Sequence, residues 1–451
     1  MQSIIALEVL TSLSKNGFSL DELVISAREL FSKKGIPGLL GLLLQLLDEN
    51  ISLQLRQDPS PDFLPKCCDH PHYVLLDRRH RQFRTSGGLV KINWRRLRCT
   101  CCNKTVIPLR EFLGLNAYQA KTQELEKTVV EVISEQSYRR GSRHLDTIGN
   151  IPVPKSTAHR WVAQSHCDEI DTGTETFDQL FADGTGYKKR CNKEEGTSNR
   201  GELRIALGVD WQGSVVPLGS WSGENWEEIA KEIKGKREKN QPVADVLVSD
   251  GETGLAKALA DLCNEHQRCS WHYIHDFSYM LWKEGVSKPE RDIRQKELIH
   301  MIGIELPKED FNAVSQQEHE EISAKLKDAK NDIEQLYHCL KSQGYDEAAG
   351  YINRGAKNIF TYLDRWLRTG LITPRVSSMI ERMMREIARR LKRIAFGWSP
   401  AGAAKMARII IKRFTSADQW KKYWDQKLRI EGNVVMALTS IKTVSPPTLG
   451  R

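Results

Sequence analysis

The strongest constraint on the fold is a run of short apolar segments and amphipathic segments between residues 176 and 276. The segments, in order, are the strand candidates FDQLFADG, ELRIALGVDWQG and SVVPLGSWSG, the helix candidate NWEEIAKEIKGKRE, the strand candidate VADVLVSDG, the helix candidate ETGLAKALADLCNE and the strand candidate RCSWHYIHD. The order β-β-β-α-β-α-β predicts a mixed α/β domain.

This order is that of a ribonuclease-H-like fold, in which the first and fourth strands lie side by side. Asp183 follows the first predicted strand and Asp250 follows the fourth, each directly before a glycine. A carboxylate at such a position projects past the sheet edge. Hard cations such as Mg²⁺ bind oxygen ligands, and a pair of these cations can activate the attacking oxygen and stabilise the leaving oxygen in phosphodiester chemistry. The pair predicts a metal site, although an aspartate at a strand end also forms turns.

A third acid candidate lies on a basic helix predicted in TPRVSSMIERMMREIARRLKR. Glu381 is in its first turn or so, ahead of the basic residues Arg385, Arg389 and Lys392, which can hold a DNA backbone. Glu386 is on the same helix and is an alternative ligand. Taken alone, Glu381 also fits an ordinary surface residue.

A cysteine-rich module is predicted over residues 66–109. Cys67 with His70 forms a C-x-x-H pair, and Cys99 with Cys102 forms a C-x-x-C pair. Each pair can hold one side of a tetrahedral Zn²⁺, and the strand residues around a Gly-Gly turn between them are typical of a zinc ribbon that binds DNA. Reduced cysteines without metal are the alternative, because further candidates lie nearby at Cys68, His72 and Cys101.

Residues 120–165 are predicted to be helical, ending in KSTAHRWVAQS. This last segment resembles the recognition helix of a helix-turn-helix, with Lys155, His159 and Arg160 as candidate DNA-binding residues, followed by the apolar residues Trp161 and Val162. A plain three-helix packing unit is the alternative interpretation.

The remaining segments complete the predicted organisation. Residues 1–55 indicate amphipathic helices, IIALEVLTSL and LDELVISARELF, with a break at GIPG, and DPSPDFLPK indicates a linker. Residues 277–370 indicate an all-helical insertion. The catalytic core is predicted to comprise residues 176–276 and 371–415, and residues 416–451 a C-terminal tail.

Charge and composition favour a nucleic-acid partner. The 451-residue chain carries a net charge of +9, and residues 77–104 and 381–413 are both rich in Lys and Arg, although a solvated basic face is the alternative for each. The N-terminus lacks the basic start of a signal peptide, and the apolar run GIPGLLGLLLQLLDEN is too short to span a bilayer. We expect a cytoplasmic protein, acting on DNA in the nucleoid, with no membrane partner. Its ten cysteines are then expected to be thiols or metal ligands.

A second C-x-x-H pair, Cys269 with His272, follows the last predicted strand. Because a single pair does not complete a structural zinc site, we expect these side chains to support the acidic centre or to contact the DNA end. A buried cysteine and a hydrogen-bonded core histidine are the alternative.

Together, ADGTGYKK at Asp183, LVSDGETG at Asp250, CSWH at Cys269 and SSMIERMMREIARRLKR at Glu381 resemble the transposases of Mutator-like elements and related prokaryotic insertion sequences. The resemblance covers residues 176–415. It implies a ribonuclease-H-like DDE transposase that cuts element ends and joins them to target DNA, using two Mg²⁺ or Mn²⁺ ions. It also implies binding to terminal inverted repeats as a homo-oligomer, and upstream zinc-binding and helix-turn-helix segments, with one structural Zn²⁺, fit the recognition of those ends.

Two other functions use the same residues. A non-catalytic DNA-binding protein derived from a transposase would not require the acids, which are intact here. A ribonuclease-H-like nuclease would share the acids, but the helical insertion and the two upstream DNA-binding modules favour a transposase.

Overall fold

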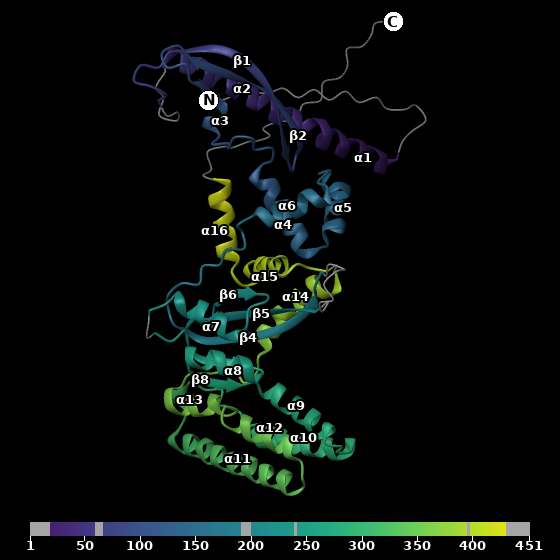
Figure 1. Cartoon of the computed structure of the whole chain (residues 1–451), viewed down its shortest axis with the longest axis vertical. Helices are drawn as coiled ribbons and strands as arrows, with labels where there is room; N and C mark the ends of the chain where they lie inside the picture. Colours follow the sequence, from purple (N-terminus) through teal and green to yellow (C-terminus); the bar gives the residue numbers. More distant parts are fainter. Residues whose placement is uncertain (1–18, 59–65, 191–199, 239–240, 395–396, 430–451) are drawn as a thin grey trace. The chain divides into compact units, whose positions relative to one another are not determined.

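The computed structural model describes residues 19–58, 66–190, 200–238, 241–394 and 397–429 (Figure 1). The chain divides into two compact units. One comprises Met1–Gln164 with Trp424–Arg451, and the other comprises Ser165–Tyr423.

The N-terminal unit begins with two helices, α1 (Leu20–Leu30) and α2 (Ile36–Gln57), joined by a π-helical turn, Phe31–Gly35. The predicted break at GIPG is therefore wrong. The chain stays helical across Pro37, and the wider π-helical turn lies directly before this proline, which has no backbone N–H to donate. The predicted segment IIALEVLTSL lies outside the described residues, as does most of the predicted linker DPSPDFLPK.

The continuous helix Leu20–Gln57 is long and apolar enough, by length and composition alone, to cross a membrane. This helix is longer than the apolar run GIPGLLGLLLQLLDEN, which alone is too short to span a bilayer, because the helix has no break at GIPG. Its C-terminal half has another partner, since Ile51 and Leu55 are buried against the β-hairpin described next.

The hairpin pairs β1 (Tyr73–Thr85) with β2 (Gly88–Cys99), and β3 (Thr105–Val106) follows on the other side of β2. The two-residue turn Ser86-Gly87 joins the strands, and Gly88 takes a positive φ of 114° that favours glycine. Ile92, Trp94 and Leu97 of β2 form a core with α2.

Four helices complete the described N-terminal part before residue 165: α3 (Pro108–Phe112), α4 (Gln123–Glu135), α5 (Tyr138–Gly149) and α6 (Lys155–Gln164). Thr122 and Ser137 cap the amino ends of α4 and α5 through their hydroxyls. Asn150 ends α5 in the left-handed conformation, and a short extended connection leads to α6.

The second unit is built on a five-stranded sheet in the order β6-β5-β4-β7-β8. Its strands are β4 (Phe177–Lys188), β5 (Arg200–Val209), β6 (Val215–Trp221), β7 (Ala244–Ser249) and β8 (Cys263–Arg268). The first three pair antiparallel, whereas β4, β7 and β8 are parallel. As predicted, the first and fourth strands of the domain, β4 and β7, are neighbours in the sheet.

Helices cover both faces of this sheet. The helices α7 (Trp226–Gly235) and α8 (Thr253–Leu259) share a core with Leu180, Ala182 and Leu247. Successive strand residues point to opposite faces, so Phe181 and Asp183 face the other side. There α14 (Ser378–Ala388) contacts β4, and α15 (Pro400–Thr415) contacts β5 and β6.

The last predicted strand was placed too late in the chain. β8 is CNEHQR, preceded by a 3₁₀ turn at Ala260–Leu262, and the predicted strand RCSWHYIHD mostly belongs to helix α9 (Ser270–Lys283). Tyr273, Phe277 and Leu281 recur every fourth residue and are fully buried. That spacing decides for helix over strand.

An all-helical segment follows β8, as predicted: α9, α10 (Lys288–Ile302), α11 (Gln316–Ser342), α12 (Asp346–Ala356) and α13 (Thr361–Thr369), with a 3₁₀ turn at Phe311–Ala313. Figure 1 shows these helices gathered together, and their buried side chains form one hydrophobic core. A π-helical turn, Arg389–Arg393, extends α14. The predicted C-terminal tail begins with a further helix, α16 (Ala417–Leu428), and its residues from 430 lie outside the described part.

A buried arginine fastens this helical segment to the sheet. Arg365 of α13 is 0% exposed, and its guanidinium bonds to Asp178 of β4 at 2.6 Å and to Asp245 of β7 at 2.9 Å. It also donates to Thr373 Oγ1 at 2.9 Å. Both aspartates lie at the amino-terminal ends of their strands, so Arg365 joins the helical segment to that end of the sheet.

We expect Arg365→Met to lower the free energy of unfolding by about 3 kcal/mol, because it leaves two carboxylates with restricted access to water and no cation. Urea titration of the metal-free protein measures this. The matched control is Arg368→Met on the same helix. Arg368 pairs with Glu265, but its side chain is 58% exposed, and the loss should stay below about 1 kcal/mol. Equal losses of unfolding free energy in the two variants would refute this stabilising role of Arg365.

Candidate metal centres

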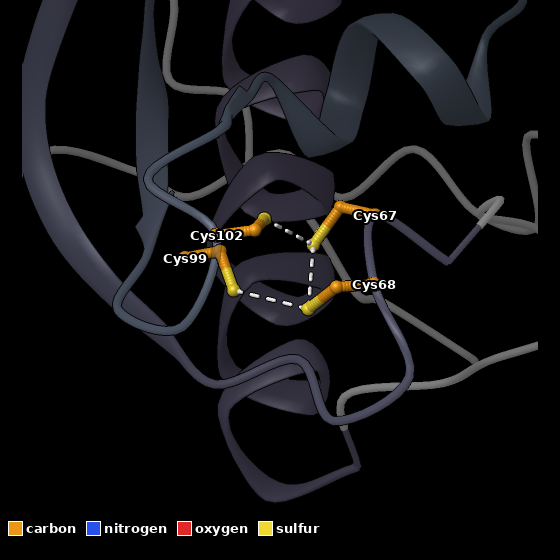
Figure 2. Close-up of side chains that lie close together, drawn as sticks. All are labelled: Cys67, Cys68, Cys99 and Cys102. Atoms are coloured by element: carbon orange, nitrogen blue, oxygen red, sulfur yellow. Dashed lines mark hydrogen bonds between the residues drawn. The ribbon is translucent and has the colours of Figure 1, made fainter.

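A cluster of four cysteines lies where the hairpin of the N-terminal unit begins and ends. Cys67 and Cys68 precede β1, and Cys99 and Cys102 end β2 and the turn after it. The antiparallel register pairs Tyr73 with Cys99, which brings the two cysteine pairs to the same end of the hairpin. Figure 2 shows the four side chains converging.

The spacing of the four sulfurs fits one tetrahedral zinc ion. The Sγ atoms lie within 4.8 Å of one another, with distances of 3.9 Å from Cys67 to Cys68, 3.8 Å from Cys68 to Cys99 and 3.5 Å from Cys67 to Cys102. A tetrahedron with Zn–S bonds of about 2.3 Å has sulfurs about 3.8 Å apart. Both the geometry and the all-thiol ligand set therefore fit Zn²⁺.

Hydrogen bonds and burial shift the pKa values of the cluster's thiols in opposite directions. The backbone N–H of Cys102 helps to lower the pKa of Cys99 to about 6, whereas restricted access to water raises the pKa of Cys68 to about 12. The Tyr73 hydroxyl donates to Cys67 Sγ at 3.3 Å, a contact that orients a ligand from outside the tetrahedron. A divalent cation would stabilise all four thiolates together.

The structure differs from the sequence prediction in one ligand, because Cys68 takes the place assigned to His70. Adjacent residues in an extended strand would point in opposite directions. Here residues 67–70 form a bend, which lets Cys67 and Cys68 point the same way and leaves His70 exposed. His72 instead lies 3.3 Å from Thr100, and Cys101 is exposed and outside the cluster.

Cys68→Ser should therefore lose zinc, whereas His70→Ser should keep it. The measurement is the metal content of the purified protein, by elemental analysis, together with its thermal unfolding. Zinc retained by Cys68→Ser and lost by His70→Ser would instead support the C-x-x-H pair that the sequence suggested.

In the second unit, the strand register brings the two candidate aspartates level. β4 and β7 are parallel, and the last paired residues are Phe181 with Val248. Extended by two residues, this register sets Asp183 of β4 level with Asp250, which directly follows β7, and neighbouring strands lie about 4.8 Å apart. Both carboxylates therefore lie just beyond the carboxyl-terminal end of the β4–β7 pairing.

The sequence suggested that Asp183 ends a strand, but in the structure the strand continues past it. β4 continues to Lys188 because it stays paired with β5, and only its pairing with β7 ends before Asp183. Burial, and then the charge of Asp250, raise the pKa of Asp183 to about 6. The negative charge of Glu381 contributes to this rise, while the N–H of Gly184 and the His272 ring oppose it.

Glu381 lies in the first turn of α14 and meets the start of α9. Its Oε1 accepts a hydrogen bond from Ser377 Oγ at 2.9 Å and lies 4.0 Å from His272 Nδ1. Cys269, His272 and Glu381 have ligand atoms within 4.8 Å of one another, a group that does not include Asp183 or Asp250.

Cys269 joins the elements that carry the acids. Its N–H donates to the carbonyl of Ser249, directly before Asp250, at 2.8 Å. Its Sγ accepts from the N–H of Ser377 at 3.4 Å. Although burial opposes ionisation, His272 and Ser377 hold the pKa of Cys269 below its usual value. The sequence indicated Cys269 and His272 as supporting residues but gave no sign of Ser377, which only the fold brings to them.

The alternative acid, Glu386, faces a different partner. It pairs with Arg389 at 3.1 Å, one turn further along the same helical run. Arg385 and Lys392 are exposed.

The candidate recognition helix α6 lies in the other unit. Its predicted DNA-binding residues Lys155, His159 and Arg160 are exposed, while Trp161 and Val162 are buried.

The raised pKa of Asp183 predicts a pH-dependent stability. Because the folded state holds this proton more tightly than the unfolded chain, ionisation destabilises the fold as the pH rises from about 4 through 6. In metal-free buffer, Asp183→Asn should be more stable than wild type above pH 6, by on the order of 2 kcal/mol, and the gain should vanish near pH 4. Urea titration across this range measures it. A gain independent of pH would contradict the assigned cause.

The sheet and its acids define a mixed α/β protein with a carboxylate centre at the ends of parallel strands. Residues 78–423 match the family model described as "Transposase, Mutator family", so the chain belongs to the Mutator family of transposases.

Among solved structures, the chain is similar to one described as "Drosophila P element transposase strand transfer complex". The sequence identity is 12% over 71% of this chain and 86% of that one, with a TM-score of 0.27. No curated protein matches the chain.

Proposed function

We propose that this transposase cleaves DNA at the ends of its element and joins them to target DNA, with Asp183, Asp250 and Glu381 as the metal-binding acids. The main support is the register of β4 and β7, which, extended by two residues, sets Asp183 level with Asp250, the residue directly after β7. Glu381 and His272 lie within electrostatic reach of Asp183.

The acids fit a hard divalent cation. Carboxylate oxygens are the ligands that Mg²⁺ and Mn²⁺ prefer, and Asp183 is partly buried beside Asp250, where two negative charges repel each other. A cation held by Asp183, Asp250 and Glu381 would offset that repulsion. When bound, two such ions activate the attacking oxygen and stabilise the leaving one.

The neighbouring residues keep the third acid in place. Ser377 Oγ donates to Glu381, and His272, whose pKa is raised by Cys269, Asp250 and Glu381 against the effect of burial, faces the same carboxylate. The His272 ring therefore carries positive charge more readily than a free histidine. In this role it orients Glu381 and attracts the phosphate of the DNA strand.

The strand order supports a ribonuclease-H-like core. Three antiparallel strands are followed by two parallel ones in the order β6-β5-β4-β7-β8, and the first and fourth strands, β4 and β7, are neighbours. Within this proposal, the helical segment α9–α13 is an insertion between β8 and the helix that carries Glu381.

The N-terminal unit supplies the proposed recognition of terminal inverted repeats. The hairpin would be a zinc ribbon held by the four cysteines, and its strands carry the basic residues Arg78, Arg79, Arg81 and Arg84. Helix α6 would read the major groove through Lys155, His159 and Arg160. Acting on two element ends requires two active sites, so we propose a homo-oligomer on DNA.

The test is cleavage and strand transfer on labelled DNA carrying the element's own ends, in Mg²⁺ or Mn²⁺. Asp250→Asn and Glu381→Gln should each lower the rate at least 100-fold while end binding is retained, because each removes a ligand without changing the shape of the side chain. Glu386→Gln is the matched control on the same helical run and should stay within a few-fold of wild type.

Loss of activity in Glu386→Gln with activity retained in Glu381→Gln would reassign the third acid. Cleavage by Asp250→Asn at the wild-type rate would refute the metal centre. A wild-type protein that binds ends tightly but never cuts them would favour a DNA-binding descendant of a transposase.

A further inference from the structure

Helix α9 carries an exposed stripe of aromatic residues that the acidic centre does not use. Trp271, Tyr279 and Trp282 are 53%, 48% and 55% exposed, and His275 is also exposed. At 3.6 residues per turn, the four positions fall within an arc of about 80°. The opposite face of α9 is already occupied, because Tyr273 and Phe277 are buried in the helical core.

The exposed rings are arranged in stacked pairs. Trp271 and His275 have ring centroids 4.8 Å apart and planes 12° from parallel, and Tyr279 and Trp282 have centroids 5.5 Å apart and planes at 27°. In each pair the inner ring faces cover each other, and the remaining ring surface is partly exposed. Leaving such surface in water is unfavourable, so an exposed row of rings indicates a ligand with flat faces of its own.

The stripe begins at the acidic centre. Trp271 precedes His272, which lies 4.0 Å from Glu381, and the two rings are in edge contact with centroids 4.8 Å apart. From Trp271 to Trp282 the helix rises about 16 Å, the length of about four to five nucleotides at 3.4 Å each.

Basic groups border the far end of the stripe. His275, Tyr279, Trp282 and Arg291 line an open hollow of about 450 Å³ between α9 and α10. The Nε of Arg291 is buried and has no hydrogen-bond partner in the described structure. Lys283 Nζ lies 5.0 Å from the centre of the Tyr279 ring. Rings flanked by cations suit bases attached to a phosphate backbone.

We propose that the outer face of α9 is a stacking platform for unpaired DNA bases, which holds a single strand next to the acidic centre. The inference rests on the proposed function, because it assumes that DNA enters the carboxylate site. Bases stack on aromatic rings irrespective of sequence, and Arg291 and Lys283 would meet the phosphates. Duplex DNA, whose bases are already stacked, has no such faces to offer.

The test measures binding alone, in an Asp250→Asn background that blocks cleavage. The probes are a short single-stranded oligonucleotide with 2-aminopurine near one end, whose fluorescence falls on stacking, and a blunt duplex of the same length. Trp282→Ala should weaken single-strand binding about 5- to 150-fold, the range measured for loss of one stacking ring. Duplex binding should change less than twofold.

Two further variants separate stacking from other effects. Trp271→Phe should retain quenching, whereas Trp271→Ala should lose it. Phe414→Ala, which removes a ring of 51% exposure from α15 in the same unit, is the matched control and should bind both probes like the parent. Circular dichroism and melting temperature confirm that each variant folds.

Unchanged quenching and affinity in Trp282→Ala would overturn the platform, while metal-dependent cleavage by the protein with Asp250 intact would leave the proposed function standing. A lower oligomer mass in Trp282→Ala, with single-strand binding intact, would also overturn it by assigning the stripe to a second copy of the chain. Cleavage at the wild-type rate in Asp250→Asn would refute the proposed function without altering the binding comparison.

Discussion

The geometry of the acidic centre depends on how the chain returns to the sheet after a long helical excursion. Between β8 and α14 it passes through five helices, and Arg375, shortly before α14, bonds back to the end of α10 at Ile302 and Ile304. The buried guanidinium of Arg365 adds a direct link to the sheet, because it bonds to strands β4 and β7 and to Thr373 on the way to α14. The Cys269 contacts with Ser249 and Ser377 then join the end of β7 to the start of α14.

The carboxylates at the two ends of the β4–β7 pairing differ in whether a cationic side chain compensates their charge. Asp178 and Asp245 share a buried arginine, whereas in the described part of the chain Asp183 and Asp250 form no ion pair with Lys or Arg. Partly buried carboxylates that repel each other destabilise a fold, so such a pair is expected where another group compensates the charge. A structural role would favour compensation at both ends. The contrast therefore supports a cation-binding role for Asp183 and Asp250.

Sequence patterns predicted what local periodicity controls. The strands β4 to β7 follow from their apolar runs, and the level placement of Asp183 and Asp250 follows from the strand order. The boundary between β8 and α9 was missed because RCSWHYIHD is rich in aromatic residues, which suit strands, and its helical period becomes visible only when Phe277 and Leu281 are included. The choice of Cys68 over His70 depends on a bend, and the roles of Ser377 and Arg365 on contacts across more than 100 residues, which spacing does not encode.

Helix α9 connects these features, which argues against treating the helical segment as a passive spacer. Its N-cap residue is Cys269, its first turn carries His272, and its inner face anchors the core through Tyr273 and Phe277. The outer face carries the aromatic stripe. A rigid helix transmits the position of one end to the other, so a strand stacked along α9 would be held in a fixed place relative to Glu381. Because phosphoryl transfer depends on aligning the attacking and leaving oxygens, a platform rooted in the same helix as the acid's neighbours would contribute to catalysis by positioning.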